Sequence, residues 1–389
     1  MKSWLFLICV SVQFSAQITL KVTEIPENTP KNATIYVAGN FNGWNPNSTP
    51  LISDGKGNQT VTIPEGNGVI EYKFTRGNWN TAEGNASGNP ISNRNSVFTG
   101  KPQTIETQIL SWEKATEKVS TAAKNVHLIS DSFLILELGR TRKIWIYLPP
   151  DYETSKKKYP VIYMQDGQNL FDNATSFSGE WEIDETLNQL FAEGDYGAIV
   201  VGIDNGDSHR IDEYTPWKNP EYGGGEGDLY ADFLAKTLKP FIDSHYRTKT
   251  GKKHNALIGS SLGALISNYA GIKYHNVFSK IGSFSPAYWI VNQEFNNYVK
   301  DSNMNLSATR IYFVAGSGES KTMTKDLETV KNNLQKKGLK PGNTFVKIDS
   351  YGQHNENYWK GEFREAYRWL FKTSKLKSKK NRNIQQKTQ

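Results

Sequence analysis

The sequence predicts an α/β domain built on a mostly parallel sheet with helices on both faces, preceded by a small all-β immunoglobulin-like sandwich. Residues 18–112 contain short alternating segments separated by turn residues, with no helical pattern of convincing length. Residues 126–373 contain apolar strand-like runs separated by helical patterns, which is typical of parallel α/β sheets. A chain of 389 residues is also too long for one ordinary domain and agrees with two.

Residues 1–16 have the features of a secretory signal peptide. Lys2 is followed by an apolar run over residues 4–10, and small residues lead to a cleavage site after Ala16. The run is too short to span a membrane, and we expect no transmembrane segment elsewhere. Cys9 is the only cysteine and would leave with the signal, so we expect no disulfide and no cysteine metal site. These features predict a secreted or periplasmic protein.

The net charge of +7 does not indicate nucleic-acid binding, because the excess of basic residues lies at one end of the chain. Residues 372–389 carry seven Lys and Arg residues and no acid, so the rest of the chain is about neutral. We expect residues 374–389 to form a disordered basic tail. Residues 113–125 are polar and lack aromatic side chains, which predicts a linker between the two domains.

Local patterns predict the individual elements. In the β region the strand candidates, joined by turn-rich stretches, are ATIYVAG, QTVTIPE and VIEYKFTR. In the α/β region the strand candidates are RKIWIYLPP, YPVIYMQD, GAIVVGID, NALIG, KIGSFSP and RIYFVAG. The helix candidates between several of them are EIDETLNQLFAE, DLYADFLAKTLKPFIDSHY and TKDLETVKNNLQKKG.

The stretch Gly259-Ser260-Ser261-Leu262-Gly263 fits the G-x-S-x-G pattern of a nucleophile elbow. It follows a strand candidate and precedes a helix-like run, so Ser261 is expected on a tight turn at the carboxyl end of a strand. The glycines permit close approach of strand and helix, and the helix N-terminus favours an oxyanion. The alternative is a simple Gly/Ser-rich turn, and Ser260 fills a position open to any small residue.

A serine hydroxyl needs a base to take its proton, and His354 is the predicted base. The expected chain order is Ser, acid, His, and only His275 and His354 follow Ser261. His275 lies in or just beyond the predicted helix after the serine, which carries it away. His354 lies in the loop YGQHNENYW after a strand-like segment, where a surface histidine without a catalytic role is the alternative.

The acid that orients the base is predicted to be Glu319. It follows the strand RIYFVAG in the loop SGES, where an acid at the end of a neighbouring strand should lie. Asp349 lies inside the last predicted strand, too close in sequence to the histidine to reach it easily. The remaining acids between Ser261 and His354 are Glu294, Asp301, Asp326 and Glu328.

Seven segments spread over the α/β region carry a resemblance to a known family. They are YPVIYMQDGQNLFD, VGIDNGDSHRIDEYTPW, YADFLAKTLKPFIDSHYRT, IGSSLGAL, SFSPAYW, YFVAGSGES and GQHNENYW. The region resembles the putative-esterase family of α/β hydrolases, which includes esterase D, feruloyl and acetyl-xylan esterases, siderophore esterases and mycolyltransferases. The resemblance implies the α/β-hydrolase fold, with Ser261 as nucleophile, His354 as base in an H-x-E-x-x-W pattern, and Glu319 as acid.

The resemblance also implies the groups around the nucleophile. The oxyanion hole would use the backbone N–H groups of Leu262 and Gln168. Ala264 stands where many relatives have a second glycine, a departure that we expect to be harmless. Five residues in family-like loops would line the acyl or alcohol pocket, unless they only pack those loops: Trp181, Arg210, Tyr214, Trp217 and Trp289.

In the β region, the segments IYVAGNFNGWNP, IEYKFTRGNW and SNRNSVF carry a second resemblance. They are similar to starch-binding domains of the glucoamylase type and to the glycogen-binding module of the AMP-activated kinase. Trp44 and Trp79 match the two positions at which sugar rings would stack on indole faces. The alternative is a spacer whose tryptophans are structural.

Together these features predict an exported serine esterase that works through a Ser-His-Glu triad and an acyl-enzyme, with no metal or organic cofactor. The fused β region, with its possible glucan partner, favours acetyl or feruloyl groups on polysaccharide as the substrate. Three alternatives stay open: a siderophore triester hydrolase, an acyltransferase, and a polysaccharide-binding protein without catalysis. No specific pairing of carboxylates indicates a glycosidase.

Overall fold

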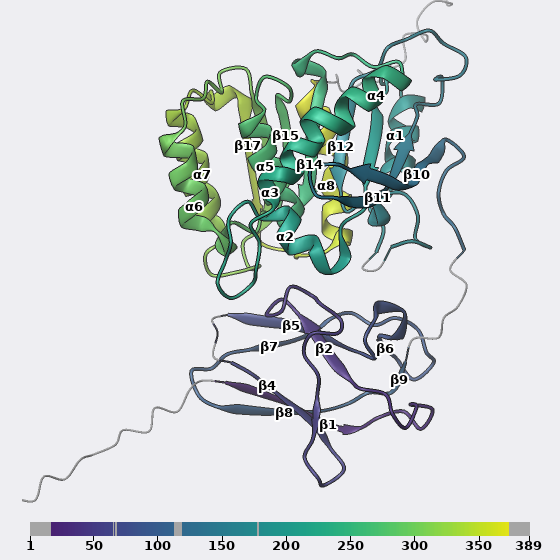
Figure 1. Cartoon of the computed structure of the whole chain (residues 1–389), viewed down its shortest axis with the longest axis vertical. Coiled ribbons are helices and arrows are strands. Elements are labelled where there is room, and N and C mark those ends of the chain that lie inside the picture. Colours follow the sequence, from purple (N-terminus) through teal and green to yellow (C-terminus); the bar gives the residue numbers. More distant parts are fainter. Residues whose placement is uncertain (1–16, 65, 67, 113–118, 177–178, 373–389) are drawn as a thin grey trace, which may run out of the picture. The chain divides into compact units, whose positions relative to one another are not determined.

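The computed structural model divides the chain into two compact units, Met1–Glu117 and Lys118–Gln389 (Figure 1). It describes residues 17–64, 66, 68–112, 119–176 and 179–372. The predicted signal peptide, the predicted basic tail and the first part of the predicted linker lie outside the described residues.

Short strands build the N-terminal unit, as the alternating pattern predicts. In the first strand the buried side chains are Ile18, Leu20 and Val22, each one separated by a less buried neighbour. They share one core with Val37 and Phe74 of a second sheet, so two sheets form a sandwich. The sheets have the orders β3-β4-β1-β8, β2-β5-β7 and β6-β9. The bounds are β1 (Ile18–Glu24), β2 (Tyr36–Gly39), β3 (Ile52–Ser53), β4 (Gln59–Ile63), β5 (Val69–Thr75), β6 (Glu83–Gly84), β7 (Arg94–Val97), β8 (Gln103–Gln108) and β9 (Ser111–Trp112).

An eight-stranded sheet of order β10-β11-β13-β12-β14-β15-β16-β17 organises the C-terminal unit. The pairs β10–β11 and β11–β13 are antiparallel, and all the following pairs are parallel. This is the mostly parallel sheet that the sequence predicts. The bounds are β10 (Val126–Ile135), β11 (Arg140–Tyr147), β12 (Val161–Gln165), β13 (Ile199–Ile203), β14 (Asn255–Ser260), β15 (Lys280–Phe284), β16 (Arg310–Gly316) and β17 (Thr344–Asp349).

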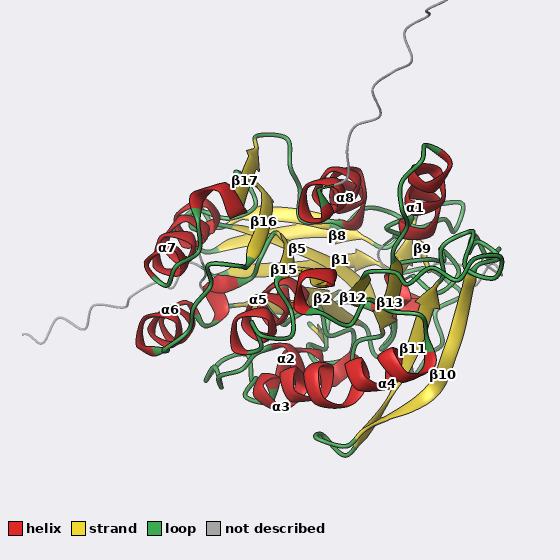
Figure 2. Cartoon of the chain, turned by 90° about the horizontal axis from the view of Figure 1, so that it is seen from above, coloured by secondary structure: helices red, strands yellow, loops and turns green. Residues whose placement is uncertain are grey.

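Helices cover both faces of this sheet (Figure 2). Because side chains alternate along a strand, Val161 and Tyr163 pack on one face with α3 to α7, whereas Ile162 and Met164 pack on the other with α1 and α8. The bounds are α1 (Ile183–Ala192), α2 (Arg210–Tyr214), α3 (Gly227–Asp232), α4 (Lys239–His245), α5 (Leu262–Lys273), α6 (Asn292–Asp301), α7 (Met323–Lys336) and α8 (Glu356–Phe371).

Several elements differ from the sequence-based prediction: α6 and α8 are not among the predicted helices, and α8 begins within the segment predicted as the loop of His354. The single helix predicted over residues 228–246 is divided by a π-helical turn, Phe233–Leu238, because Pro240 has no N–H to continue the regular ladder. The edge strand β10 was not predicted. Only Ile135 of its ten residues is buried, so its sequence lacks the apolar run that identifies the inner strands.

Candidate active site

Ser261 occupies the sharp turn between β14 and α5, with φ 55° and ψ −122°. Its N–H donates to the carbonyl of Phe284 at 2.9 Å, and its carbonyl accepts from the N–H of Ala287 at 3.1 Å. A Cβ on Gly259 would lie 2.5 Å from the carbonyl oxygen of Gly263, so the first glycine is required by close approach of strand and helix. The motif therefore has the strained geometry expected of a nucleophile elbow.

Glu319 and His354 come together just after the neighbouring strands β16 and β17 end. Oε2 of Glu319 accepts a hydrogen bond of 2.8 Å from Nδ1 of His354, and the acid side chain is only 1% exposed. Its other oxygen, Oε1, accepts from the N–H of Gly316 at 2.5 Å and from the hydroxyl of Ser285 at 2.8 Å. The hydroxyl of Ser285 in turn accepts from Nε1 of Trp359 at 2.9 Å. With Nδ1 protonated, the Nε2 lone pair of the histidine is free to accept a proton.

Two glycines bring these two loops into contact. A Cβ on Gly316, at the end of β16, would lie 2.0 Å from the carbonyl oxygen of Gly352, in the loop before α8. Neither position has a positive φ, so the requirement is space and not backbone conformation. The contact sets the loop of His354 directly against the strand end that carries Glu319.

Among the described residues, no hydrogen bond joins the hydroxyl of Ser261 to His354. In hydrolases without substrate this bond is often long, and it tightens when the substrate complex forms. The acid–base pair is therefore already formed after β16 and β17, and the nucleophile turn follows β14 of the same parallel sheet.

The predicted oxyanion donors lie at the starts of two helical segments. Leu262 is the first residue of α5, and Gln168 lies in the 3-10 turn Gly167–Asn169. N–H groups in a first turn have no partner within their own helix, so they can bind an anion. A Cβ on Gly167 would lie 2.8 Å from the backbone nitrogen of Asp204, and this close approach fixes the turn against the sheet.

Buried polar contacts hold this turn, here named the oxyanion loop (residues 166–169). Asp166 has a left-handed φ of 56° and binds Arg210 through two hydrogen bonds of 2.7 and 2.9 Å. Nδ2 of Asn205 donates to the same carboxylate at 2.8 Å. Arg210, predicted to line the pocket, is thus occupied in supporting the oxyanion loop.

Glu356 is a buried acid of the site, and its only sequence signal is its place in the H-x-E-x-x-W pattern. Its Oε1 accepts from Nδ2 of Asn169 at 3.2 Å. Burial raises the pKa of its carboxyl group to about 8, and Asp166 acts in the same direction. No local pattern reveals this environment, because the acid and the asparagine are far apart in sequence.

Two of the predicted pocket residues lie inside the fold, and a third is half-buried. Trp181 is 3% exposed and packs against Phe284 at a ring distance of 5.0 Å, and Tyr214 is fully buried. Trp217 is half-buried: it packs against Tyr269 at 5.3 Å at the edge of the core and also lines a surface hollow with Glu294 and Tyr298. These aromatic side chains pack the loops, so the expectation that Trp181 and Tyr214 line the pocket is corrected by their burial.

Trp289 differs from the other predicted pocket residues because its side chain is 43% exposed. It lies in the short turn after Ala287, whose N–H binds the carbonyl of Ser261. Its ring meets that of Tyr222 edge to face at 5.3 Å. These contacts place an accessible aromatic pair on two segments that follow β13 and β15, the neighbours of β12 and β14 in the sheet.

In the N-terminal unit, Trp44 and Trp79 approach each other from separate loops. Their ring centroids are 6.2 Å apart, with an angle of 40° between the planes. Trp44 has a left-handed φ of 61°, which is rare for a bulky residue, and its N–H donates to the carbonyl of Gly39. The side chain of Asn42 holds the same loop through hydrogen bonds to Gly39 and to Thr49.

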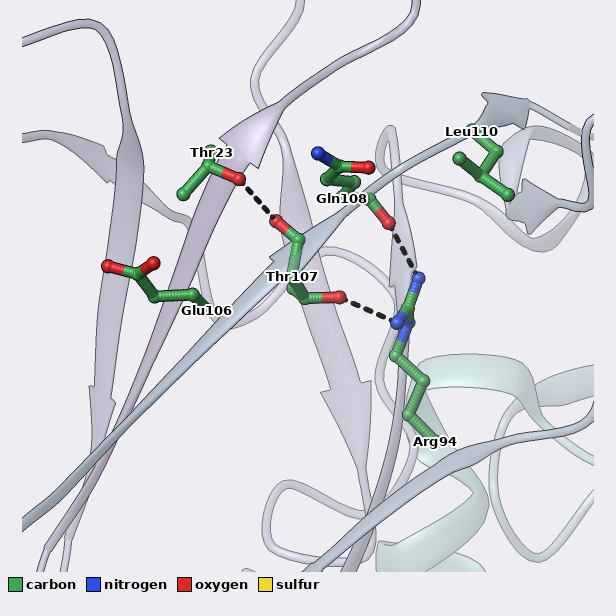
Figure 3. A pocket seen from close by; sticks show the side chains of 6 residues that line it. All are labelled: Thr23, Arg94, Glu106, Thr107, Gln108 and Leu110. Carbon is green, nitrogen blue, oxygen red and sulfur yellow. Dashed lines mark hydrogen bonds between the residues drawn. The ribbon is translucent and has the colours of Figure 1, made fainter.

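A surface hollow of about 500 Å³ lies elsewhere in the same unit (Figure 3). Its one cation, Arg94, already binds Glu83 through Nε and Nη2 and donates to Thr107 and to the carbonyl of Gln108. The hollow therefore offers little unused charge to a ligand. Its lining residues are Thr23, Arg94, Glu106, Thr107, Gln108 and Leu110.

One group of acids in the described part of the chain has spacing suited to a metal ion: Glu180, Asp184 and Glu185, with oxygens within 4.8 Å. Asp184 accepts from the N–H of Ala123, in the predicted linker. Burial, and then Asp184, raise the pKa of Glu185 to about 7. Within the residues that the structure describes, no helix has the length and apolar character needed to cross a membrane.

The two units are similar to different known proteins. The family model described as "Putative esterase" matches residues 136–370. Uncharacterized protein YbbA of Bacillus subtilis is 29% identical over 243 residues, covering 59% of this chain and 92% of that protein. An α-amylase of Niallia circulans is 37% identical over 100 residues, in the N-terminal region, covering 25% of this chain and only 8% of the amylase.

Solved structures share the fold at low identity. The enterobactin esterase of Shigella flexneri, solved in the presence of enterobactin, has a TM-score of 0.53 and 14% identity, covering 91% of this chain and 92% of that one. A ferulic acid esterase has a TM-score of 0.50 and 15% identity, covering 64% of this chain and 99% of the other.

Proposed function

Because the chain belongs to the family described as "Putative esterase", which makes it a carboxylic ester hydrolase, we propose that Ser261, His354 and Glu319 form its catalytic triad. The observation that carries the proposal is the 2.8 Å hydrogen bond between the buried Glu319 and His354, at the same end of the sheet as the Ser261 turn. It is the orienting contact that a base needs beside a serine nucleophile.

In the proposed reaction, the hydroxyl oxygen of Ser261 attacks the ester carbonyl carbon while Nε2 of His354 takes the hydroxyl proton. The carbonyl oxygen becomes an oxyanion that the N–H groups of Leu262 and Gln168 bind. The histidine then gives its proton to the leaving alcohol, and the acyl group stays on the serine. Water, activated by the same histidine, attacks the acyl-enzyme and releases the acid.

We propose that the predicted signal peptide exports the protein and that its substrates are acetyl or feruloyl groups on polysaccharide. The exposed Trp289, packed against the half-buried Tyr222, offers an aromatic surface to an acyl or sugar ring. A xylanase/feruloyl esterase of Xylanibacter ruminicola is 24% identical to this chain over 151 residues. A siderophore esterase or an acyltransferase would use the same triad, so these activities are distinguished only by the ester that is cleaved and by the group that accepts the acyl group.

Residues 17–389 should therefore hydrolyse methyl ferulate or release acyl groups from acylated xylan. We expect kcat/KM for one of these esters to exceed that for enterobactin by about tenfold or more. Chromatography of the products measures all three reactions in parallel. Faster turnover of enterobactin would instead favour the siderophore esterase, and transfer of the acyl group to an added sugar would favour the acyltransferase.

A second proposed function is carbohydrate binding by the N-terminal unit. The pairing of Trp44 with Trp79, and the rare backbone conformation that presents Trp44, favour a stacking surface for sugar rings. The amylase match in the same region supports a carbohydrate-binding module.

Replacing Trp44 or Trp79 by alanine is expected to weaken binding to soluble starch by about tenfold, because each variant loses a stacking face. Affinity electrophoresis in starch-containing gels measures the change, while hydrolysis of a small ester should stay the same. Leu110→Ala, which alters the exposed wall of the hollow in Figure 3, is the matched control. Weaker binding in this control alone would move the sugar site to the hollow.

A further inference from the structure

Glu356 links the loop of the proposed base to the oxyanion loop. It is the first residue of α8, shortly after His354 in the chain, and it is 8% exposed. Its Oε1 accepts the 3.2 Å hydrogen bond from Nδ2 of Asn169. Asn169 directly follows Gln168, and its backbone N–H donates to the carbonyl of Asp166. The buried acid therefore contacts the turn that carries a proposed oxyanion donor.

The charged groups that face Glu356 are Asp166 of the oxyanion loop and Arg210 of α2. Nε and Nη2 of Arg210 both bind Asp166, and among the described residues no cation forms an ion pair with Glu356. A buried carboxylate without a cation, beside a second carboxylate, is costly, so the proton stays on. With its pKa raised to about 8 by burial, Glu356 is mostly uncharged at pH 7.

We propose that Glu356 is a positioning residue for ester hydrolysis: its buried carboxyl group holds Asn169 and, through the turn, the N–H of Gln168 where the oxyanion forms. The inference rests on the proposed triad and oxyanion hole. While the carboxyl group of Glu356 is uncharged, it does not repel the negative charge that develops on the oxyanion. After the proton is lost, the carboxylate repels that charge, which slows the chemical step and leaves ground-state binding little changed.

The test compares kcat and KM for p-nitrophenyl acetate from pH 6 to 10 in the parent chain, Glu356→Gln, Glu356→Ala and a matched control, Glu362→Gln. Glu362 is an acid of the same helix with the same 8% exposure, but it binds Lys347 at 2.7 Å. We expect the parent kcat to fall above pH 8, by about fivefold at pH 9.5, and Glu356→Gln to keep its plateau. Glu356→Ala should lose about tenfold in kcat at pH 7 with KM little changed, and Glu362→Gln should follow the parent.

Asp204, beside Gly167, also titrates near the oxyanion loop, because burial raises its pKa to about 6. Asp204 is almost fully ionised at pH 8 and is present in every variant, so its titration cannot produce a fall in kcat above pH 8 that differs between the variants. An alkaline fall that persists in Glu356→Gln, or that disappears equally in Glu362→Gln, overturns the inference. So does unchanged kcat in a folded Glu356→Ala.

Circular dichroism and thermal melting identify a variant that does not fold. If Glu356→Ala fails in this way, the pH profile of Glu356→Gln still decides, because the glutamine keeps the hydrogen bond from Asn169. A parent chain without ester turnover at any pH would count against the proposed triad itself. Failure of the inference and failure of the proposed function thus give different results.

Discussion

Ser261→Ala is expected to lower kcat/KM for p-nitrophenyl acetate by about a thousandfold or more, because the variant cannot form the acyl-enzyme. The residual rate would come from substrate binding and the oxyanion donors, which the change leaves in place. The left-handed φ of 55° at this position strains any side chain, so alanine should fold as serine does. Initial rates by p-nitrophenol absorbance, with thermal melting beside them, measure both effects.

Ser260→Ala is the matched control, since it makes the same change one residue earlier at a side chain that is 6% exposed. We expect it to retain activity within a fewfold of the parent. A fluorophosphonate probe should attach once per chain, at Ser261, and mass spectrometry of the labelled peptide locates it. Equal activity in the parent and in Ser261→Ala, or labelling at another serine, would contradict the proposed nucleophile.

Local sequence patterns could predict this site because its key residues each carry a short-range signal. Gly259 stands out because a Cβ there would lie 2.5 Å from the carbonyl oxygen of Gly263, and Gly263 because a Cβ there would lie 3.0 Å from Gln165 and Asp166 at the end of β12. Chain order and position after predicted strands then identified His354 and Glu319, and the structure brings these two within hydrogen-bond distance. The mostly parallel sheet follows from the same kind of signal, since its inner strands are continuous apolar runs.

The supporting residues could not be predicted, because their roles depend on contacts between distant segments. From its sequence position Arg210 is only a loop cation, and only the fold shows that its Nε and Nη2 groups bind Asp166. The sequence predicts that Tyr214 lines the pocket, yet its side chain is completely buried. Ser285 gives no catalytic signal in sequence, although its hydroxyl bridges Glu319 and Trp359. Periodicity shows that a side chain is apolar or polar but does not show its partner.

Glu319→Gln is expected to lower kcat by about a hundred- to ten-thousandfold, because it reverses the tautomer of the base. Oε1 of the acid accepts from Gly316 and from Ser285, so the amide oxygen of glutamine should take that place. Its NH2 group would then face Nδ1 of His354 and require an unprotonated nitrogen there. The proton moves to Nε2, where the base can no longer accept one from Ser261.

Asp349→Asn is the matched control, because it neutralises the other acid at the neighbouring strand end. Asp349 accepts from the hydroxyl of Tyr358 at 2.8 Å and lies near Lys347, so its change should affect stability more than kcat. Pre-steady-state release of p-nitrophenol separates acylation from hydrolysis of the acyl-enzyme, and both should slow in Glu319→Gln because the same histidine serves both steps. If Asp349→Asn lost activity and Glu319→Gln kept it, the orienting acid would be Asp349, and the 2.8 Å bond to His354 would be structural.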